Sequence, residues 1–382
     1  MDAPAADRVA LLRDGVEAFP AMLDAVVSAR HEVLVEMYWF DDSPVSRRFI
    51  AALVERARAG VAVRVSYDSI GSIGSDRGRF DALLAAGGRV IEYNPIAPWR
   101  RRFRFGWVSQ RDHRKIIVID GRVAFIGGLN IGAPWAPVEE GGGGWRDDVA
   151  RVEGTGAQRL RGLFYDTWCR QSGDRPADVT PASNWGRLQA ARKASGLALA
   201  ASTDVTVLGH DAWGARRVIR RVYLQRIRGA ERRIIIANSY FIPDIATCRA
   251  LEQAARRGVE VRVILPRVSD VPVVTWAARH LYTRLMKAGV HVHEYLGRVL
   301  HAKTALVDEW VTTGSYNLDS LSWRVNLEAN MATTEPAFVR AVAASLARDL
   351  ADCEEVDPVA WTRRPWADKV RAWGWYLFRK FL

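Results

Sequence analysis

The chain has 382 residues, 49% of them hydrophobic, and a formal net charge of +12 from 55 lysines and arginines against 43 acidic residues. This length and composition predict two or three globular domains, and the charge predicts a polyanionic partner, either nucleic acid or the acidic face of a membrane. Cys169, Cys248 and Cys353 are too scattered for a disulfide framework or a zinc site, and no run of about 18 apolar residues occurs, so we expect a protein that is neither secreted nor membrane-spanning.

Strand-like and helical segments alternate in the first part of the chain. Residues 32–38 (EVLVEMY) and 61–67 (VAVRVSY) have strand character, and residues 45–58 between them have helical periodicity. Short apolar strands that alternate with helices predict an α/β unit with a parallel or mixed sheet covered by helices.

The second part of the chain repeats this order. RAGVAVRV at 58–65 is answered by RRGVEVRV at 256–263, and AAGGRVIEY at 85–93 by KAGVHVHEY at 287–295. Such an internal duplication predicts two α/β units related by a pseudo-twofold axis. We expect a first half over residues 1–175, a linker rich in Pro, Ser and Gly at 176–203, and a second half over residues 204–382. The expected second-half elements are a strand at 233–237, a helix at 245–257 and a strand at 259–265.

Both halves carry the same polar motif, H-x-K-x4-D, followed by a glycine-rich polar tail, GGLN at 127–130 and GSYN at 314–317. Two matches with similar tails are improbable by chance, so we interpret each as half of one catalytic site. Only six lysines occur in the chain, and two of them lie in these motifs, which suggests that a compact ammonium group is required there. The six motif residues are His113, Lys115 and Asp120 in HRKIIVID, and His301, Lys303 and Asp308 in HAKTALVD. Strand alternation predicts that each histidine points to the same side as its lysine.

Two histidines that meet across a pseudo-twofold axis can divide one displacement at phosphorus between them. One attacks as a neutral imidazole, and its protonated partner donates a proton to the departing alcohol. Lysines and asparagines would hold the negative oxygens, and no metal or other cofactor is needed. A histidine used in this way needs an acceptor for its other ring nitrogen. Asp147 in WRDDVARVEG and Glu328 in NLEAN are the candidates, although a surface carboxylate or a strand salt bridge would also account for each.

These residues resemble the motifs of the phospholipase D superfamily over nearly the whole chain. More narrowly, the sequence is similar to bacterial cardiolipin synthases in YWF at 38–40, HRKIIVIDGRVAFIGGLNIG, WRDDVARVEG, NSYFIPD at 238–244, RRGVEVRVILPRVSD, and HAKTALVD with GSYNLDS. The resemblance implies two phospholipase D-like α/β/α units with central mixed sheets. It also implies transfer of a phosphatidyl group, typically between two phosphatidylglycerols to give cardiolipin and glycerol. The sequence shows no N-terminal transmembrane pair like that of some cardiolipin synthases, so we expect the shorter, membrane-peripheral type.

The resemblance implies a role for each matching residue. The histidines are nucleophile and general acid, with His113 expected to attack, and the motif aspartates are largely architectural. Phosphate is bound by the two lysines and by Asn130, Asn317 and Ser315. Gly128 stands where many superfamily members have Ser, which removes a hydroxyl from the first half-site.

Two segments mix basic and aromatic residues. The segment 94–112 has no counterpart before His301, and the C-terminal segment 366–382 has helical spacing of its apolar residues. Both suit a phospholipid headgroup layer, whereas single-stranded nucleic acid or packing on the protein itself could also explain the first, and docking on the core could explain the second. The predicted membrane contacts are Trp99, Arg100, Arg101, Arg102, Phe103, Phe105, Trp107, Trp366, Trp373 and Phe381.

The sequence therefore predicts a peripheral enzyme on the cytoplasmic side of the bacterial inner membrane, with an anionic phospholipid membrane as partner, phosphatidylglycerol as substrate and no nucleic acid. The acceptor and the oligomeric state are not readable from the sequence. The alternative is a metal-independent phosphodiesterase, either a phospholipase D hydrolase or a nuclease. A non-catalytic lipid-binding scaffold is disfavoured because both motifs are intact. His291 and His293 could ligate a metal, but nothing nearby completes a ligand set, so we interpret them as a strand surface.

Overall fold

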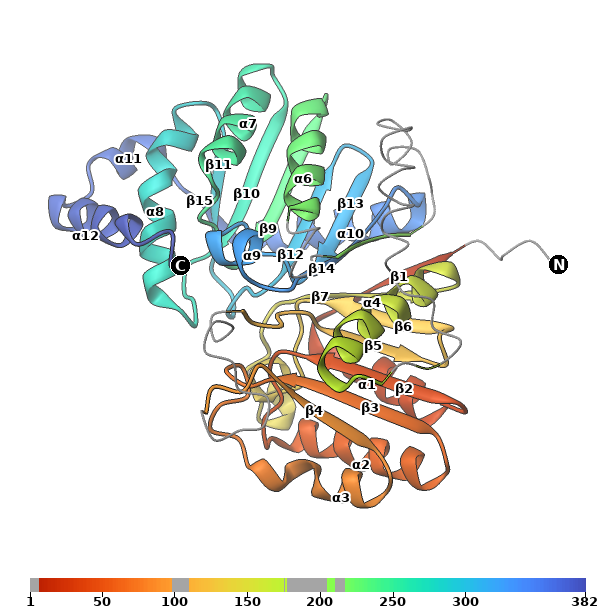
Figure 1. The fold of residues 1–382 in the computed structure, drawn as a ribbon. Helices are drawn as coiled ribbons and strands as arrows, with labels where there is room; N and C mark the ends of the chain where they lie inside the picture. The colour runs from red at the N-terminus through yellow and green to blue at the C-terminus, as the bar shows by residue number, and fades with distance from the viewer. Residues whose placement is uncertain (1–6, 98–109, 175, 177–204, 210–216) are drawn as a thin grey trace.

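Two mixed β-sheets, one from each half of the sequence, are stacked on one another in the protein (Figure 1). The computed structural model describes residues 7–97, 110–174, 176, 205–209 and 217–382. The predicted linker at 176–203 therefore lies outside the described residues, apart from Pro176, and the domain boundaries remain a prediction.

The first sheet has the strand order β1-β7-β6-β5-β2-β3-β4, in which β2, β3 and β4 are parallel and the other pairs are antiparallel. Its strands are β1 (Arg8–Arg13), β2 (Glu32–Met37), β3 (Ala62–Asp68), β4 (Arg89–Tyr93), β5 (Ile116–Ile119), β6 (Val123–Gly127) and β7 (Asp148–Glu153). The helices of this half are α1 (Asp14–Val27), α2 (Pro44–Arg58), η1 (Arg77–Phe80), α3 (Asp81–Ala85), η3 (Ala133–Trp135), η4 (Val138–Glu140) and α4 (Thr155–Ser172).

The second sheet repeats this order as β8-β14-β13-β12-β9-β10-β11, with β15 added beside β11. The matching topology confirms the predicted fold of two duplicated α/β units. The strands are β8 (Thr206–Gly209), β9 (Arg233–Asn238), β10 (Glu260–Pro266), β11 (His291–Tyr295), β12 (Lys303–Val307), β13 (Trp310–Gly314), β14 (Ala329–Thr333) and β15 (Cys353–Glu355). The helices are α6 (Val218–Gly229), α7 (Ile245–Arg256), α8 (Pro272–Met286), α9 (Ser320–Arg324), α10 (Pro336–Ala351), α11 (Pro358–Thr362) and α12 (Trp366–Leu377).

Both faces of each sheet are buried, because alternate side chains along a strand point into two different hydrophobic cores. Val33 and Val35 pack with α1 and α2 on the outer face of the first sheet, whereas Leu34 between them enters a core shared by both halves. That shared core also contains residues of α4, α10 and the second sheet. Burial on both faces explains why the strands are near-continuous apolar runs.

The halves are joined by paired backbone hydrogen bonds next to the two motif histidines. The His113 amide donates to the Leu327 carbonyl at 3.0 Å, and the His301 amide donates to the Arg146 carbonyl at 2.7 Å. The buried Arg146 guanidinium also donates twice to Asp349 of α10, at 2.7 and 2.8 Å. An ion pair with this many bonds is costly to break, so it fixes how the halves sit together.

One sequence-based expectation about these segments is wrong. We expected each His–Lys pair to lie on a strand, but β5 begins at Ile116 and β12 at Lys303, so both histidines and Lys115 precede the strands. The residues just before the two histidines, Asp112 and Leu300, form isolated bridges to Leu327 and Arg146 of the opposite half.

Candidate active site

The two motif histidines are each held by a carboxylate from the opposite half of the chain. His113 Nδ1 lies 3.2 Å from Glu328 Oε2 and 3.2 Å from the carbonyl oxygen of Ser315. His301 Nδ1 lies 2.7 Å from Asp147 Oδ2. Glu328 precedes β14 of the second half, and Asp147 precedes β7 of the first half. Each histidine therefore has its carboxylate partner in the other half of the chain. In both cases the carboxylate occupies Nδ1, which leaves Nε2 to face a substrate, and Nε2 of His301 also lies 3.1 Å from Lys303 Nζ.

The two motif lysines are buried beside these histidines. Lys115 Nζ donates to the carbonyl of His113 at 2.6 Å, and Lys303 Nζ lies 3.0 and 3.1 Å from the two ring nitrogens of His301. Burial lowers the pKa of Lys115 to about 7 and that of Lys303 to about 8. Burial and the adjacent lysine also lower the pKa of each histidine, that of His301 well below 6.5. An anionic ligand would favour the charged form of each of these four groups, so the cluster is suited to binding an anion.

The two carboxylates differ in their protonation. Burial by itself would raise the pKa of Glu328, but His113, Lys115 and the Ser315 hydroxyl hold it below its usual range. Burial raises the pKa of Asp147 to about 7, against the lowering effect of Lys303 and of the Trp135 ring N–H. At neutral pH Glu328 is ionised, whereas Asp147 is close to its midpoint.

The predicted phosphate-binding residues are all buried, and several are already bonded within the protein. Asn130 Oδ1 accepts from the Trp39 amide at 3.0 Å, and Asn317 Oδ1 accepts from the Ser239 hydroxyl at 2.9 Å. The Ser315 hydroxyl donates to Glu328. These bonds use the amide oxygens, so both NH₂ groups can serve as donors to a ligand. The hydroxyl of Ser315, in contrast, positions the carboxylate that holds His113.

The motif aspartates lie away from the histidines, at the far end of the strand. Asp120 accepts the backbone N–H groups of Arg30, His31 and Glu32 at 2.7 to 2.9 Å, and thereby fixes the start of β2. Asp308 accepts those of residues 231–233 at 2.9 to 3.0 Å before β9. Both adopt left-handed φ values, 51° and 52°, a conformation that Asp tolerates better than most residues. This placement fits the architectural role that the resemblance implies for these two residues of the motifs.

Several residues at the site were not predicted. The Tyr38 ring lies 4.9 Å from the His113 ring, and the Tyr240 ring lies 6.2 Å from the His301 ring. Tyr240 donates to Asp270 at 2.5 Å. A partial signal was available, because each tyrosine lies just past the end of one of two matching strands, β2 and β9, although the strand registers align Tyr38 with Ser239 and Tyr240 with Trp39. Trp135, which donates to Asp147 at 2.9 Å, and Ser322, which donates to Glu328 at 2.8 Å, have no such signal.

The remaining predicted residues that the structure describes are not part of this cluster. The basic and aromatic residues 99–105 and 107 lie outside the described residues. Trp366 and Trp373 lie on α12, and Phe381 follows its end. His291 pairs with Glu355 of β15 at 2.7 Å. Within the described part of the chain, no group of three or more His, Cys, Asp or Glu side chains is arranged to hold a metal ion. None of the described helices combines the length and the apolar character needed to cross a membrane.

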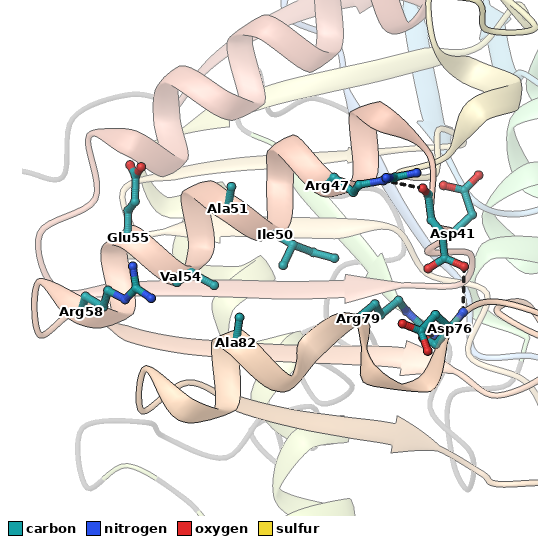
Figure 2. A pocket seen from close by; sticks show the side chains of 11 residues that line it. Asp41, Arg47, Ile50, Ala51, Val54, Glu55, Arg58, Asp76, Arg79 and Ala82 are labelled. Carbon is teal, nitrogen blue, oxygen red and sulfur yellow. Dashed lines mark hydrogen bonds between the residues drawn. The ribbon is translucent and has the colours of Figure 1, made fainter.

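A groove of about 640 Å³ lies elsewhere, between α2 and the η1–α3 segment (Figure 2). Its apolar floor includes Ile50 and Val54, and charged residues such as Arg47, Arg58 and Asp76 line its rim. No residue of either motif lines it, so it is separate from the histidine site.

The fold and the paired histidine sites define a phospholipase D-like protein. In fold it is similar to a phosphatidylserine synthase from Haemophilus influenzae Rd KW20, with a TM-score of 0.73 and 12% identity over 98% of this chain and 95% of that one. A polyphosphate kinase from Porphyromonas gingivalis has a TM-score of 0.59 and 14% identity over 92% of this chain and 49% of that one.

Residues 22–134 and 223–350 match the family model described as cardiolipin synthase, phospholipase D-like domain. The chain is 36% identical to cardiolipin synthase B of Escherichia coli (strain K12) over 366 residues, which cover 94% of this chain and 84% of that protein. It is 32% identical to a cardiolipin synthase of Geobacillus thermodenitrificans (strain NG80-2) over 367 residues, 96% of this chain and 70% of that protein. The chain therefore belongs to the cardiolipin synthase family of phospholipase D-like proteins, which confirms the resemblance.

Proposed function

We propose that this protein is a phosphatidyltransferase that makes cardiolipin from phosphatidylglycerol through a phosphohistidine intermediate. Membership of the cardiolipin synthase family supports the reaction class and the phospholipid substrates. The observation that carries the mechanism is the crosswise pairing of His113 with Glu328 and of His301 with Asp147, beside two buried lysines.

The difference between the two pairs supports a division of roles. Glu328 is ionised and His113 neutral at pH 7, so Nδ1–H points to the carboxylate and Nε2 carries a free lone pair. His113 is therefore assigned as the nucleophile. The Asp147–His301 pair takes up one proton near pH 7. One proton then lies between Asp147 and Nδ1 of His301, and whichever of these two groups holds it, Nε2 of His301 carries a hydrogen. His301 is assigned as the acid.

In the first step, Nε2 of His113 attacks phosphorus, the bond from phosphorus to the glycerol oxygen breaks, and His301 gives that oxygen its proton. In the second step, His301 takes the proton from the hydroxyl of a second phosphatidylglycerol, whose oxygen attacks phosphorus and displaces His113. Lys115, Lys303 and the NH₂ groups of Asn130 and Asn317 stabilise the negative oxygens in both steps.

We further propose that the protein acts at the cytoplasmic face of the bacterial inner membrane, where its substrates lie. Its net charge of +12 supports attraction to an anionic surface.

Incubation with phosphatidylglycerol vesicles, followed by mass spectrometry of the lipids, tests the function. Cardiolipin and free glycerol are expected from the wild type and neither from His113→Ala. Phosphatidic acid without cardiolipin would show a hydrolase instead. Unchanged lipid, with cleavage of DNA or RNA in the absence of metal, would favour the nuclease.

A further inference from the structure

The C-terminal helix α12 is already docked on the protein by one face. Ala372 is 1% exposed, the Tyr376 ring stacks on His280 of α8 at 4.5 Å, and the Arg371 guanidinium lies 4.8 Å from the Trp276 ring. These contacts hold the helix against α8, at the edge of the second half (Figure 1). Its orientation is therefore fixed by packing.

The opposite face of α12 is apolar and exposed. Trp366, Val370, Trp373 and Leu377 follow one another at intervals of four, three and four residues, which places them on one stripe, and each is at least half exposed. Phe381, just past the helix, is 76% exposed. Among the large apolar side chains exposed in the described residues, every Trp and Phe lies between residues 366 and 381. A concentration of this kind marks an interaction surface.

The charges around this stripe have one dominant sign. Residues 366–382 contain four basic residues and one acidic residue, Asp368. Lys369 and Lys380 are exposed at the edge of the stripe. Exposed rings with lysines beside them suit the boundary between acyl chains and anionic headgroups.

A basic pocket of about 310 Å³ adjoins the end of α12. Arg324, Arg379 and Lys380 line it together with Trp323, and its one carboxylate, Asp244, is paired with Arg220. The Arg220 and Arg324 guanidinium groups lie 5.4 and 5.5 Å from the Trp323 ring. Cationic donors gathered in a pocket of this size fit a phosphate group.

The short helix α9 lies between this pocket and the candidate active site and contacts both. Ser320, Trp323 and Arg324 of this short helix line the pocket, while Ser322 donates to Glu328 on the other side. The face that carries α12 therefore adjoins the histidine site.

We propose that α12 and the Trp323 pocket form a docking surface for an anionic phospholipid bilayer. The rings of α12 enter the interface, and the pocket holds the phosphate of a lipid headgroup beside the active site. The inference names the membrane-binding surface of the proposed phosphatidyltransferase and rests on that function only for its biological context. Aliphatic residues within the stripe favour a lipid surface over nucleic acid, which would stack on rings but not on Val370 or Leu377.

Co-sedimentation of the full chain with vesicles of phosphatidylcholine, with and without phosphatidylglycerol, tests the proposal. The wild type is expected to bind the anionic vesicles more tightly. Removing three interfacial rings together is expected to weaken that binding at least about tenfold. The ring variant is Trp366→Ala/Trp373→Ala/Phe381→Ala, and its control, with exposed apolar residues of the first half, is Val16→Ala/Leu84→Ala/Val138→Ala.

The charge variant Arg324→Gln/Lys380→Gln should lose binding to anionic vesicles by roughly fivefold per charge at low salt and lose little on neutral ones. Arg232→Gln, an exposed arginine paired with Glu309 at the start of β9, is the matched control. Equal binding of wild type to both vesicles, or unchanged binding of the ring variant, would overturn the proposal. A change in oligomeric state of the ring variant with vesicle binding intact would identify the stripe as a contact between copies and overturn it as well.

Activity separates this inference from the proposed function. On short-chain phosphatidylglycerol dispersed below its micelle concentration, the ring variant should keep the wild-type rate, and on vesicles it should lose it. If the wild type binds vesicles but makes no cardiolipin, only the proposed function is contradicted. If the ring variant and the wild type make cardiolipin on vesicles at equal rates, only the docking surface is contradicted.

Discussion

The half-sites around His113 and His301 have the same arrangement of histidine, lysine and carboxylate. They differ in which carboxylate holds the histidine and in the residue next to that carboxylate. Glu328 is one methylene longer than Asp147, and Ser315 stands where the first half has Gly128. A Cβ atom added at Gly128 would lie 2.3 Å from Asp147 Oδ1, so that half has no room for a serine. The shorter Asp147 instead accepts the Trp135 ring N–H at 2.9 Å.

Because of this difference, the two copies of a duplicated site can take different chemical roles. Glu328 accepts hydroxyl donors from Ser315 and Ser322 and stays ionised. Asp147 has no serine hydroxyl beside it, and burial raises its pKa to about 7. Two near-equal histidines are thereby given partners of different protonation, which is the condition for a separate nucleophile and acid.

Removal of each histidine in turn is expected to have the largest effect and to distinguish the nucleophile from the acid. Both His113→Ala and His301→Ala are expected to lower the rate on phosphatidylglycerol by at least about a thousandfold. On a phosphatidyl ester of p-nitrophenol, whose leaving group needs no proton, His301→Ala should regain much of its first-step rate because only the acid is missing. Release of p-nitrophenol in a rapid-mixing experiment measures that step.

The His301→Ala variant is next mixed with the radiolabelled p-nitrophenyl ester, and the reaction is quenched in alkali. The label should then be on His113, and acid should release it. Recovery of His113→Ala on the activated ester, with label on the His301 that this variant retains, would reverse the assignment.

Exchange of the carboxylates for amides is expected to have the next largest effect. Glu328→Gln removes the ionised partner of the nucleophile and should lower kcat about a hundredfold, whereas Asp147→Asn should lower it about tenfold. Thermal unfolding of both variants provides the check that the fold is intact. Equal losses would remove the distinction between the half-sites.

The Gly128→Ser substitution tests the steric origin of the difference. The added side chain must push Asp147 from His301, so kcat should fall about tenfold and stability by about 1–3 kcal/mol. Ser315→Gly is the reciprocal variant, which removes a donor to Glu328 without a clash. If Gly128→Ser were as active and stable as the wild type, the gap beside Asp147 would not matter.

The pH dependence of kcat/KM should be bell-shaped and change severalfold between pH 6 and 8.5. The acidic limb reflects protonation of His113 below pH 6.5, where the nucleophile is lost. The alkaline limb reflects loss of protons with a pKa of about 7 from the Asp147–His301 pair and Lys115 and of about 8 from Lys303. Asp147→Asn should change the alkaline limb and leave the acidic one in place. A flat profile over this range would contradict these assignments.

The smallest effect on catalysis is expected at the motif aspartates. Asp120→Asn keeps a residue that tolerates the left-handed backbone but weakens three hydrogen bonds, so it should cost about 1–3 kcal/mol of stability. The rate per folded molecule should stay within about twofold, since a group that only supports the fold adds nothing to transition-state binding. Denaturant unfolding and active-site titration measure the two quantities, and a large loss of rate in a stable Asp308→Asn variant would return these residues to the catalytic group.

Much of the fold was readable from local sequence. The strand at 32–38 and the helix at 45–58 match β2 and α2 closely, because their periodicities report which side chains face a core. The duplication of H-x-K-x4-D likewise gave the pair of half-sites and the family. The exposed stripe of α12 was also visible as a helical pattern, but its docking on α8 through Ala372 and Tyr376 was not.

The duplicated motif was enough to predict two equivalent histidine sites and to name Asp147 and Glu328 as candidates to hold them. The packing of the two halves then places each carboxylate beside the histidine of the opposite half, and the fold of each half places the motif aspartates at the starts of β2 and β9. The physical reason is that these contacts join residues 154 to 215 positions apart, or about 90 in the case of Asp120. Local periodicity specifies which face of an element is buried, whereas the packing of one half on the other specifies what that face meets.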